Sequence, residues 1–173
     1  MKLINKFLTS FLTIAVGFYS CKKDEVGGTA TRDTAGEWYV IADAVKADGS
    51  LVTKDVRKLG HFKIGTYNTV QNTSDKMWVD DYNNFWKFKG KVDLDLANMS
   101  FSGKNIQNAS TRGDAKITFD ITNGKVLKGV GRYPNGTVAD SIVFEVKFSN
   151  DNPVGYDHYR ISGVRYSGLE DND

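Results

Sequence analysis

The sequence predicts an all-β protein, an antiparallel β-barrel built as a meander of about eight to ten strands. Apolar and polar side chains alternate with period two over several runs, as they do in half-buried strands. Turn signals such as Asp48-Gly49, Asn123-Gly124 and Pro134-Asn135-Gly136 separate these runs. No amphipathic helical pattern follows Cys21. A two-sheet β-sandwich is the alternative architecture for such a chain.

The first 20 residues are predicted to be the signal peptide of a lipoprotein. They combine a basic start with a short apolar run at 7–19, which is too short to span a bilayer as a mature helix. Cys21, the one cysteine of the chain, stands where such a signal is cut. A lone thiol in an exported protein cannot form an internal disulfide and therefore needs another role. The alternative interpretation of 7–19 is a buried core helix.

The residues around the cysteine resemble the lipobox of bacterial lipoproteins. In Phe18-Tyr19-Ser20-Cys21 a small residue precedes the cysteine, and the two aromatic residues resemble the relaxed lipobox of the Bacteroidetes. The resemblance implies that acyl chains on Cys21 anchor the protein to a membrane. Lys22-Lys23-Asp24-Glu25 resembles the charged tetrad that directs such lipoproteins to the cell surface, although it also fits a solvated linker. The implied location is the outer membrane, on its periplasmic face or at the cell surface.

The mature chain is predicted to consist of a tether, one domain and a short tail. Residues 21–34 form the tether, 35–168 the barrel domain and 169–173 an acidic, disordered tail. Removal of the signal peptide takes away two lysines and no acidic residue, so the 23 basic side chains become 21 against 21 acidic ones. This balance argues against nucleic acid as a partner.

The strands are predicted from the alternation of side chains. The clearest is 85–95, where Trp86, Phe88, Val92 and Leu94 fall on one face and charged residues on the other. It belongs to a central stretch, 61–94, of three strands separated by polar turns. In chain order the predicted strands are 36–42, 61–70, 76–79, 85–95, 99–103, 115–121, 125–133, 138–148 and 156–166, and 51–59 is a looser strand or a loop.

Two sets of residues resemble known families. Gly36-Glu37-Trp38 resembles the Gly-x-Trp signature of lipocalins, in which the tryptophan plugs the closed end of the barrel. Thr66-Tyr67-Asn68-Thr69, Trp78-Val79-Asp80-Asp81 and Phe85-Trp86 resemble the Bacteroidetes lipoprotein family called "lipid-binding putative hydrolase" over roughly residues 30–168. The resemblance implies an antiparallel lipocalin-like (calycin) β-barrel, which fits the binding of a small hydrophobic or lipid-like ligand. Support for catalysis comes from the family name alone.

Aromatic side chains are the main candidates for lining a ligand cavity, because large rings supply apolar area and tryptophan and tyrosine add a polar group. The alternative is that they fill a small barrel completely. The candidates are Trp38, Tyr67, Trp78, Trp86, Phe88 and Phe144.

The last predicted strand has two possible orientations. If the face with Tyr156, His158 and Arg160 points inward, Arg160 can pair with a ligand carboxylate and Tyr156 can donate a hydrogen bond to it. The opposite face, with Tyr159 and Ile161, is equally suited to the interior. The pattern favours the orientation in which His158 and Arg160 point outward.

The sequence offers little for catalysis or metal binding. His61 and His158 are the only bases that titrate near neutral pH and are the weak candidates for a hydrolase. There is no Gly-x-Ser-x-Gly motif, no cofactor motif and no metal-ligand spacing. Three functions follow: a lipoprotein that binds an apolar or amphipathic ligand without chemistry, a hydrolase on the same barrel, and a surface interaction module with a solid core.

Overall fold

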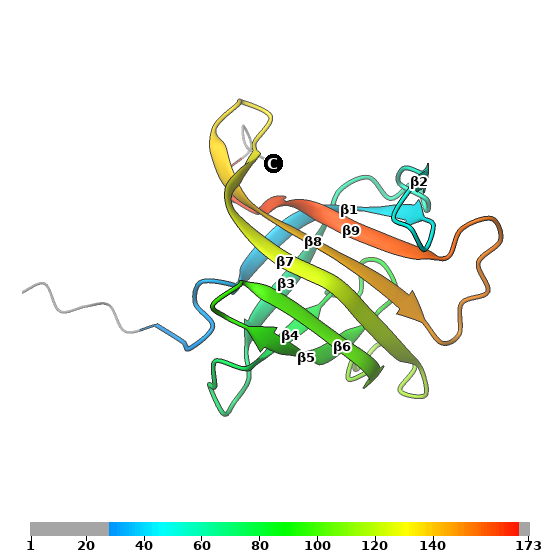
Figure 1. Cartoon of the computed structure of the whole chain (residues 1–173), viewed down its shortest axis with the longest axis horizontal. Helices are drawn as coiled ribbons and strands as arrows, with labels where there is room; N and C mark the ends of the chain where they lie inside the picture. The colour runs from blue at the N-terminus through cyan, green and yellow to red at the C-terminus, as the bar shows by residue number, and fades with distance from the viewer. Residues whose placement is uncertain (1–27, 170–173) are drawn as a thin grey trace, which may run out of the picture.

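The computed structural model describes residues 28–169, which form a closed antiparallel β-barrel (Figure 1). The predicted signal peptide, Cys21 and the end of the acidic tail lie outside the described residues. The nine strands are β1 (Gly36–Val45), β2 (Leu51–Thr53), β3 (Phe62–Asn68), β4 (Lys76–Asp80), β5 (Lys89–Asp95), β6 (Ser100–Gln107), β7 (Thr118–Arg132), β8 (Val138–Phe148) and β9 (His158–Arg165).

The order of the strands in space is the order of a meander. The sheet runs β2-β1-β3-β4-β5-β6-β7-β8-β9, and β9 pairs back onto β1, so that Val40 lies opposite Gly163. The barrel therefore consists of β1 and β3 to β9, while β2 extends from the end of β1. Pairing of the first and last strands removes the free edges that a sandwich would keep. The predicted barrel is confirmed, and the alternative of a sandwich is not.

The connections gather at two ends of the barrel, because neighbouring antiparallel strands exchange at alternate ends. One end, which we call the Trp38 end, lies at the start of β1 and carries the connections 69–75, 96–99 and 133–137. The other, which we call the mouth end, carries the connections 46–61, 81–88, 108–117 and 149–157.

Alternation decides which side chains enter the core. On β8 the inward side chains are Ile142, Phe144, Val146 and Phe148, as the sequence pattern predicts. On β9 the inward residues are Tyr159 and Ile161. The predicted outward orientation of His158 and Arg160 is therefore confirmed.

The strand predicted over 85–95 begins only at Lys89, so the prediction is wrong for its first part. Residues 81–88 form a loop instead, with Tyr82, Asn83 and Lys87 at positive φ angles of 50°, 68° and 55°. Left-handed residues interrupt an extended strand. Trp86 and Phe88 consequently reach the core from a loop rather than from the face of a strand.

Asn123-Gly124 is not the turn that the sequence predicts. It lies inside the 15-residue strand β7, where the pairing with β8 shifts between Thr122 and Lys125. Asn123 has a φ of 53°, and a side chain at Gly124 would have its Cβ 2.4 Å from the carbonyl oxygen of Phe101. The pair therefore forms a bulge that bends one long strand.

Candidate functional site

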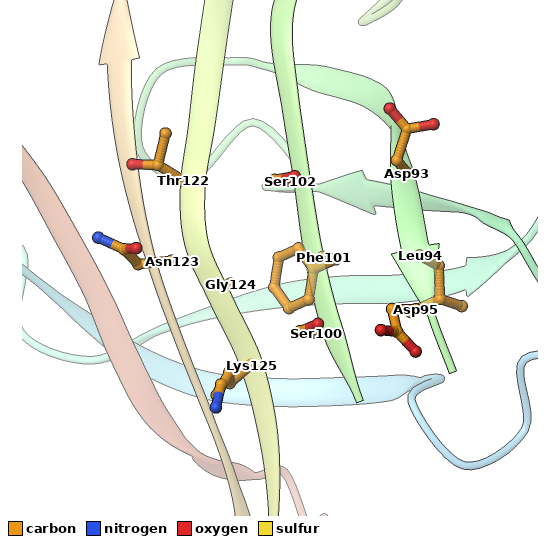
Figure 2. A pocket seen from close by; sticks show the side chains of 10 residues that line it. All are labelled: Asp93, Leu94, Asp95, Ser100, Phe101, Ser102, Thr122, Asn123, Gly124 and Lys125. Carbon is orange, nitrogen blue, oxygen red and sulfur yellow. The ribbon is translucent and has the colours of Figure 1, made fainter. Parts of the chain in front are cut away.

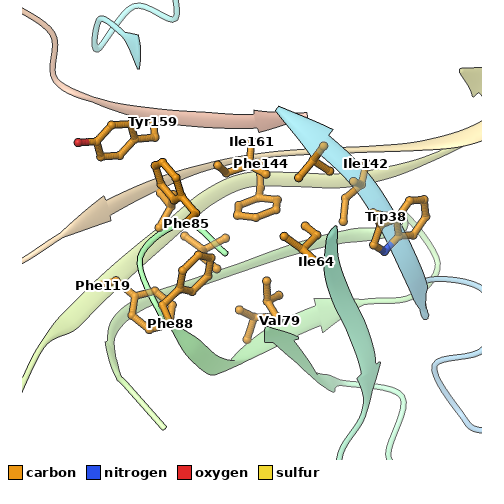
Figure 3. Packing of buried hydrophobic residues seen from close by; sticks show 14 of the residues in the cluster. Trp38, Ile64, Val79, Phe85, Phe88, Phe119, Ile142, Phe144, Tyr159 and Ile161 are labelled. Atoms are coloured by element: carbon orange, nitrogen blue, oxygen red, sulfur yellow. The ribbon is translucent and has the colours of Figure 1, made fainter. Parts of the chain in front are cut away.

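The interior of the barrel is filled with apolar side chains. Three of the predicted ligand-binding residues, Trp38, Phe88 and Phe144, lie there and are almost completely buried. Their neighbours include Phe119, 5.1 Å from Phe88, and Phe101, 5.7 Å from Phe144, both measured between ring centroids. Figure 3 shows the core extending from Trp38 at one end to Tyr159 at the other. A ligand can therefore enter this interior only where side chains move.

Trp38 closes one end of the barrel. Its Nε1 donates to Oγ1 of Thr66 at 2.9 Å, and that hydroxyl donates to the carbonyl oxygen of Thr34 at 2.6 Å. The Arg165 guanidinium lies 4.6 Å from the Trp38 ring centroid and also donates to the carbonyl oxygen of Ala35 at 3.0 Å. The Trp38 Nε1, the Thr66 hydroxyl and the Arg165 guanidinium therefore each have a partner. The Trp38 end is thus a structural plug and leaves ligand entry to the other end.

A buried carboxylate organises the loop 81–88 at the mouth end. Asp81 has no exposed surface, and its two oxygens accept N–H bonds from Asn83, Phe85, Trp86 and Phe88 at 2.7 to 3.2 Å. Burial raises the pKa of this carboxyl above its ordinary value, while the N–H bonds act in the opposite direction. Because the four donors share one acceptor group, the loop is held as a unit.

The loop places aromatic rings into the mouth end. The Trp86 ring stacks on Phe148 with centroids 4.5 Å apart, and its Nε1 donates to Oδ1 of Asn150 at 3.0 Å. The Phe85 ring stacks on Phe62 at 5.7 Å and meets the edge of Tyr159 at 5.1 Å. The loop rings therefore fill space that rings from three strands surround.

Polar groups surround these rings. The Arg57 guanidinium lies 3.9 Å from the Trp86 ring centroid and 5.3 Å from that of Phe85. The hydroxyls of Tyr156 and Tyr159 are hydrogen-bonded at 2.7 Å, and burial, together with this bond, raises the pKa of Tyr159. We call Arg57, Phe85, Trp86, Tyr156 and Tyr159 the mouth cluster.

The other two candidate rings, Tyr67 and Trp78, lie on the outer face. Their strands send Ile64, Met77 and Val79 inward, and alternation places the tyrosine and the tryptophan outside. The structure therefore places these two residues outside the barrel interior, contrary to the prediction that they line it.

Arg160 also lies outside the barrel, apart from Tyr156, which belongs to the mouth cluster. It donates to the carbonyl oxygen of Gly49 at 2.6 Å and lies 3.4 Å from the Glu145 carboxylate. The predicted carboxylate-binding pair of Arg160 and Tyr156 is therefore not assembled.

The two histidines are in different surroundings. The His61 ring stacks on Tyr39 at 5.1 Å, and Nε2 of His158 lies 3.4 Å from Oε2 of Glu145. The barrel surface has three hollows, which the next paragraph describes. Neither histidine lines any of them. No nucleophile hydrogen-bonds to either ring among the contacts of residues 28–169, so the geometry gives no support to hydrolysis.

Three hollows lie along β4 to β8. The first, of about 580 Å³, is lined by Asp93, Leu94, Asp95, Ser100, Phe101, Ser102, Thr122, Asn123, Gly124 and Lys125 (Figure 2). The second, of about 370 Å³, is lined by Trp78, Lys91, Asp93, Gly103, Lys104, Ile106, Gln107 and Ala109. The third, of about 270 Å³, lies over β6 to β8. Polar and charged residues contribute to all three linings, in contrast to the apolar interior.

Within 28–169, no three His, Cys, Asp or Glu side chains gather closely enough to hold a metal ion. Over the same residues, the structure has no helix with the length and hydropathy needed to cross a bilayer.

Comparison with known protein families assigns the chain to one of them. A family model described as "Lipid-binding putative hydrolase" matches residues 23–170. The chain belongs to this family. A search of curated proteins found no match.

Arg57, Phe85 and Tyr159 of the mouth cluster are not among the ligand-binding residues predicted from the sequence. Arg57 lies in the loosely patterned segment 51–59, of which only Leu51–Thr53 form a strand, so no signal placed it near Trp86. Tyr159 belongs to one of the two faces of the last strand that the sequence allows to point inward. Pairing of β9 with both β1 and β8 decides that this face is the inner one.

Proposed function

We propose that this member of the family is an exported lipoprotein, attached to the outer membrane through Cys21, whose barrel binds an amphipathic lipid at its mouth end. The observation that carries the proposal is the mouth cluster. In this cluster Arg57 lies over the rings of Phe85 and Trp86, and it has no carboxylate partner among the described residues. A loop, and not a strand, places these two rings in the core. An acyl chain and an acidic head group match these two features.

The loop 81–88 offers a route for entry. Its rings enter the core from outside the sheet, so they can leave without breaking any pairing between strands. The four N–H bonds to Asp81 keep the loop together while it moves. The space left by Phe85 and Trp86 is bordered by Phe62, Phe148 and Tyr159, which are apolar neighbours for an acyl chain. The head group would then take over the cationic contact with Arg57.

Extraction of the purified chain tests the proposal first. The chain from Lys22 onward contains every strand of the barrel, and it is extracted with organic solvent for mass spectrometry. We expect a stoichiometric fatty acid or related lipid. An empty extract, together with unchanged tryptophan fluorescence on addition of oleate, would replace the proposal with a surface interaction module that has a solid core.

A substitution at Arg57 tests the position of the head group. Arg57→Gln removes the charge, so oleate should bind about tenfold more weakly, since a charge-assisted hydrogen bond contributes about 1.5–3 kcal/mol. The neutral lipid 1-oleoylglycerol should bind both forms equally. Arg112→Gln, at another exposed arginine, is the matched control. Equal loss with both lipids would indicate that Arg57 supports the fold rather than the head group.

The anchor is tested separately in the bacterium that produces the protein. Growth with labelled palmitate should label the wild-type chain and leave Cys21→Ser unlabelled. Protease treatment of intact cells then separates the cell surface from the periplasmic face. A labelled Cys21→Ser chain would overturn the anchor and leave the lipid-binding site untouched.

A further inference from the structure

The outer face of β4 to β6 carries an aromatic residue that the core does not use. Trp78 is half-buried between the side chains of β5 and borders the hollow of about 370 Å³. The ammonium groups of Lys89 and Lys91 lie 5.1 and 5.2 Å from its ring centroid. This hollow is within the size range of small-molecule sites. Its single large ring is flanked by cations and lies on the outer face of the sheet, apart from the mouth cluster.

The charges of this hollow do not balance. Lys89 is 3.5 Å from the Asp80 carboxylate, and Asp93 forms an ion pair with Lys76. No carboxylate within the described part of the chain lies at ion-pair distance from Lys91 or Lys104. Two exposed ammonium groups, one of them beside the Trp78 ring, therefore remain available in this hollow and attract an anion.

The ring and the cations together define a class of ligand. One face of a sugar ring presents C–H groups that pack on the negative face of an indole. A carboxylate on that sugar pairs with a lysine, and its hydroxyls find hydrogen-bonding partners in Gln107 and Asp93. A bare inorganic anion would leave the aromatic ring unused, and a neutral sugar would leave the lysines unused. We propose that this hollow binds an acidic saccharide.

The neighbouring hollow extends the site. Asp93 lines both the hollow at Trp78 and that of about 580 Å³, where hydroxyl and amide side chains from β6 and β7 lead to Lys125 (Figure 2). Strand β6 contributes residues to both hollows, and its pairing with β7 shifts around Gly103. A chain of several sugar units can therefore continue from Trp78 across β6 toward Lys125. An oligosaccharide should bind more tightly than its monomer.

Binding of tri-galacturonate tests the inference, with its methyl ester as the uncharged form of the same trisaccharide. The full chain is purified in a polyoxyethylene detergent, which carries neither sugar nor charge, and titrated by calorimetry. We expect the acid to bind at least tenfold more tightly than its methyl ester and more tightly than galacturonate. No heat with the acid up to about 10 mM, which corresponds to less than about 3 kcal/mol of binding, would overturn the proposal.

Variants locate the site. Trp78→Ala should weaken tri-galacturonate binding at least tenfold, and Lys104→Gln should weaken the acid while sparing the ester. Lys54→Gln, at an exposed lysine next to β2, should change neither. Unchanged circular dichroism and unchanged oleate binding show that the barrel is intact. Equal binding of inorganic sulfate and the trisaccharide, with no effect of Trp78→Ala, would reduce the site to a general anion contact and overturn the saccharide.

Discussion

At the scale of single residues, Asp81 holds the loop 81–88 together. Its carboxylate is the shared acceptor of four backbone donors, so its replacement leaves several of them without a partner at once. In Asp81→Asn, an NH2 group would face N–H donors. We expect the free energy of unfolding in urea to fall by about 2–4 kcal/mol, because hydrogen bonds to buried charges contribute about 1.5–3 kcal/mol each and their loss is partly relieved by relaxation.

The matched control is Asp95→Asn. Asp95 is exposed and accepts from the backbone N–H and the side-chain amide of Asn98 in a turn at the Trp38 end, where water can replace a lost partner. Its substitution should change the free energy of unfolding by less than about 0.5 kcal/mol. Similar losses at both positions would mean that the loop 81–88 is held by its rings and not by the carboxylate.

The sequence predicted residues well where alternation applies and poorly where it does not. Phe144 was placed in the core because it alternates within an uninterrupted strand. Trp78 alternates too, but its strand is short and the neighbouring Val79 is equally apolar, so the pattern did not show which one points inward. Arg57 belongs to the segment 51–59, whose loose pattern assigns its side chain to neither face. Its position over Trp86 depends on how a connection folds over the mouth end.

At the scale of elements, the hairpin formed by β7 and β8 projects beyond the barrel (Figure 1). Asp140 ties its base to the barrel: it accepts from the Gly129 N–H at 3.0 Å and pairs with Lys128 at 3.1 Å and with Arg165 of β9 at 3.4 Å. Burial alone would raise the pKa of the Asp140 carboxyl, but these partners outweigh it and lower the pKa.

The lowered pKa gives a pH-dependent prediction. A folded-state pKa below the unfolded value adds stability above the unfolded pKa, near 3.8, and this stability is lost as the pH falls through the folded pKa. Asp140→Asn should therefore cost up to about 1 kcal/mol in free energy of unfolding at pH 7, typical of partly exposed pairs. The difference from wild type should shrink toward pH 3. A constant difference across this range would show that the side chain acts through packing.

The elements also show why one predicted turn failed. Asn-Gly signals a two-residue hairpin, and the same positive φ at the asparagine equally suits a bulge. Asn123 and Gly124 are followed by residues that continue to pair with β8, so the chain bends without reversing. Local sequence does not distinguish the two outcomes, because the decision depends on the partner strand.

At the scale of the whole molecule, the barrel closes where β9 pairs with β1, and this pairing requires a glycine at position 163. A Cβ at Gly163 would lie 2.0 Å from the carbonyl oxygen of Tyr39 and 2.6 Å from the Cα of Val40, which are backbone atoms of β1. Gly163→Ala should therefore lower the free energy of unfolding by about 1–3 kcal/mol, as overpacking does. Hydrogen exchange should accelerate most along β1 and β9. Ser162→Ala, one residue away, is the control, and equal effects of the two would argue against close packing at the seam.

The architecture as a whole was the most predictable part. Consecutive hairpins dictate a meander, and the number of strands with an apolar face on each allows it to close. The seam between β1 and β9 was not visible as such, because its partners are more than one hundred residues apart in the sequence. No local pattern records a contact of that range.

That seam also has consequences for the time course of folding. Strand β1 leaves the ribosome first, whereas its second partner, β9, is completed almost at the end of synthesis. Until then one side of β1 presents unpaired N–H and C=O groups, to which another chain can add. Contacts of such sequence separation also place folding on a scale of about milliseconds to seconds. A growing chain is thus exposed to aggregation until its last strand arrives, and a chaperone that covers β1 would protect it during this interval.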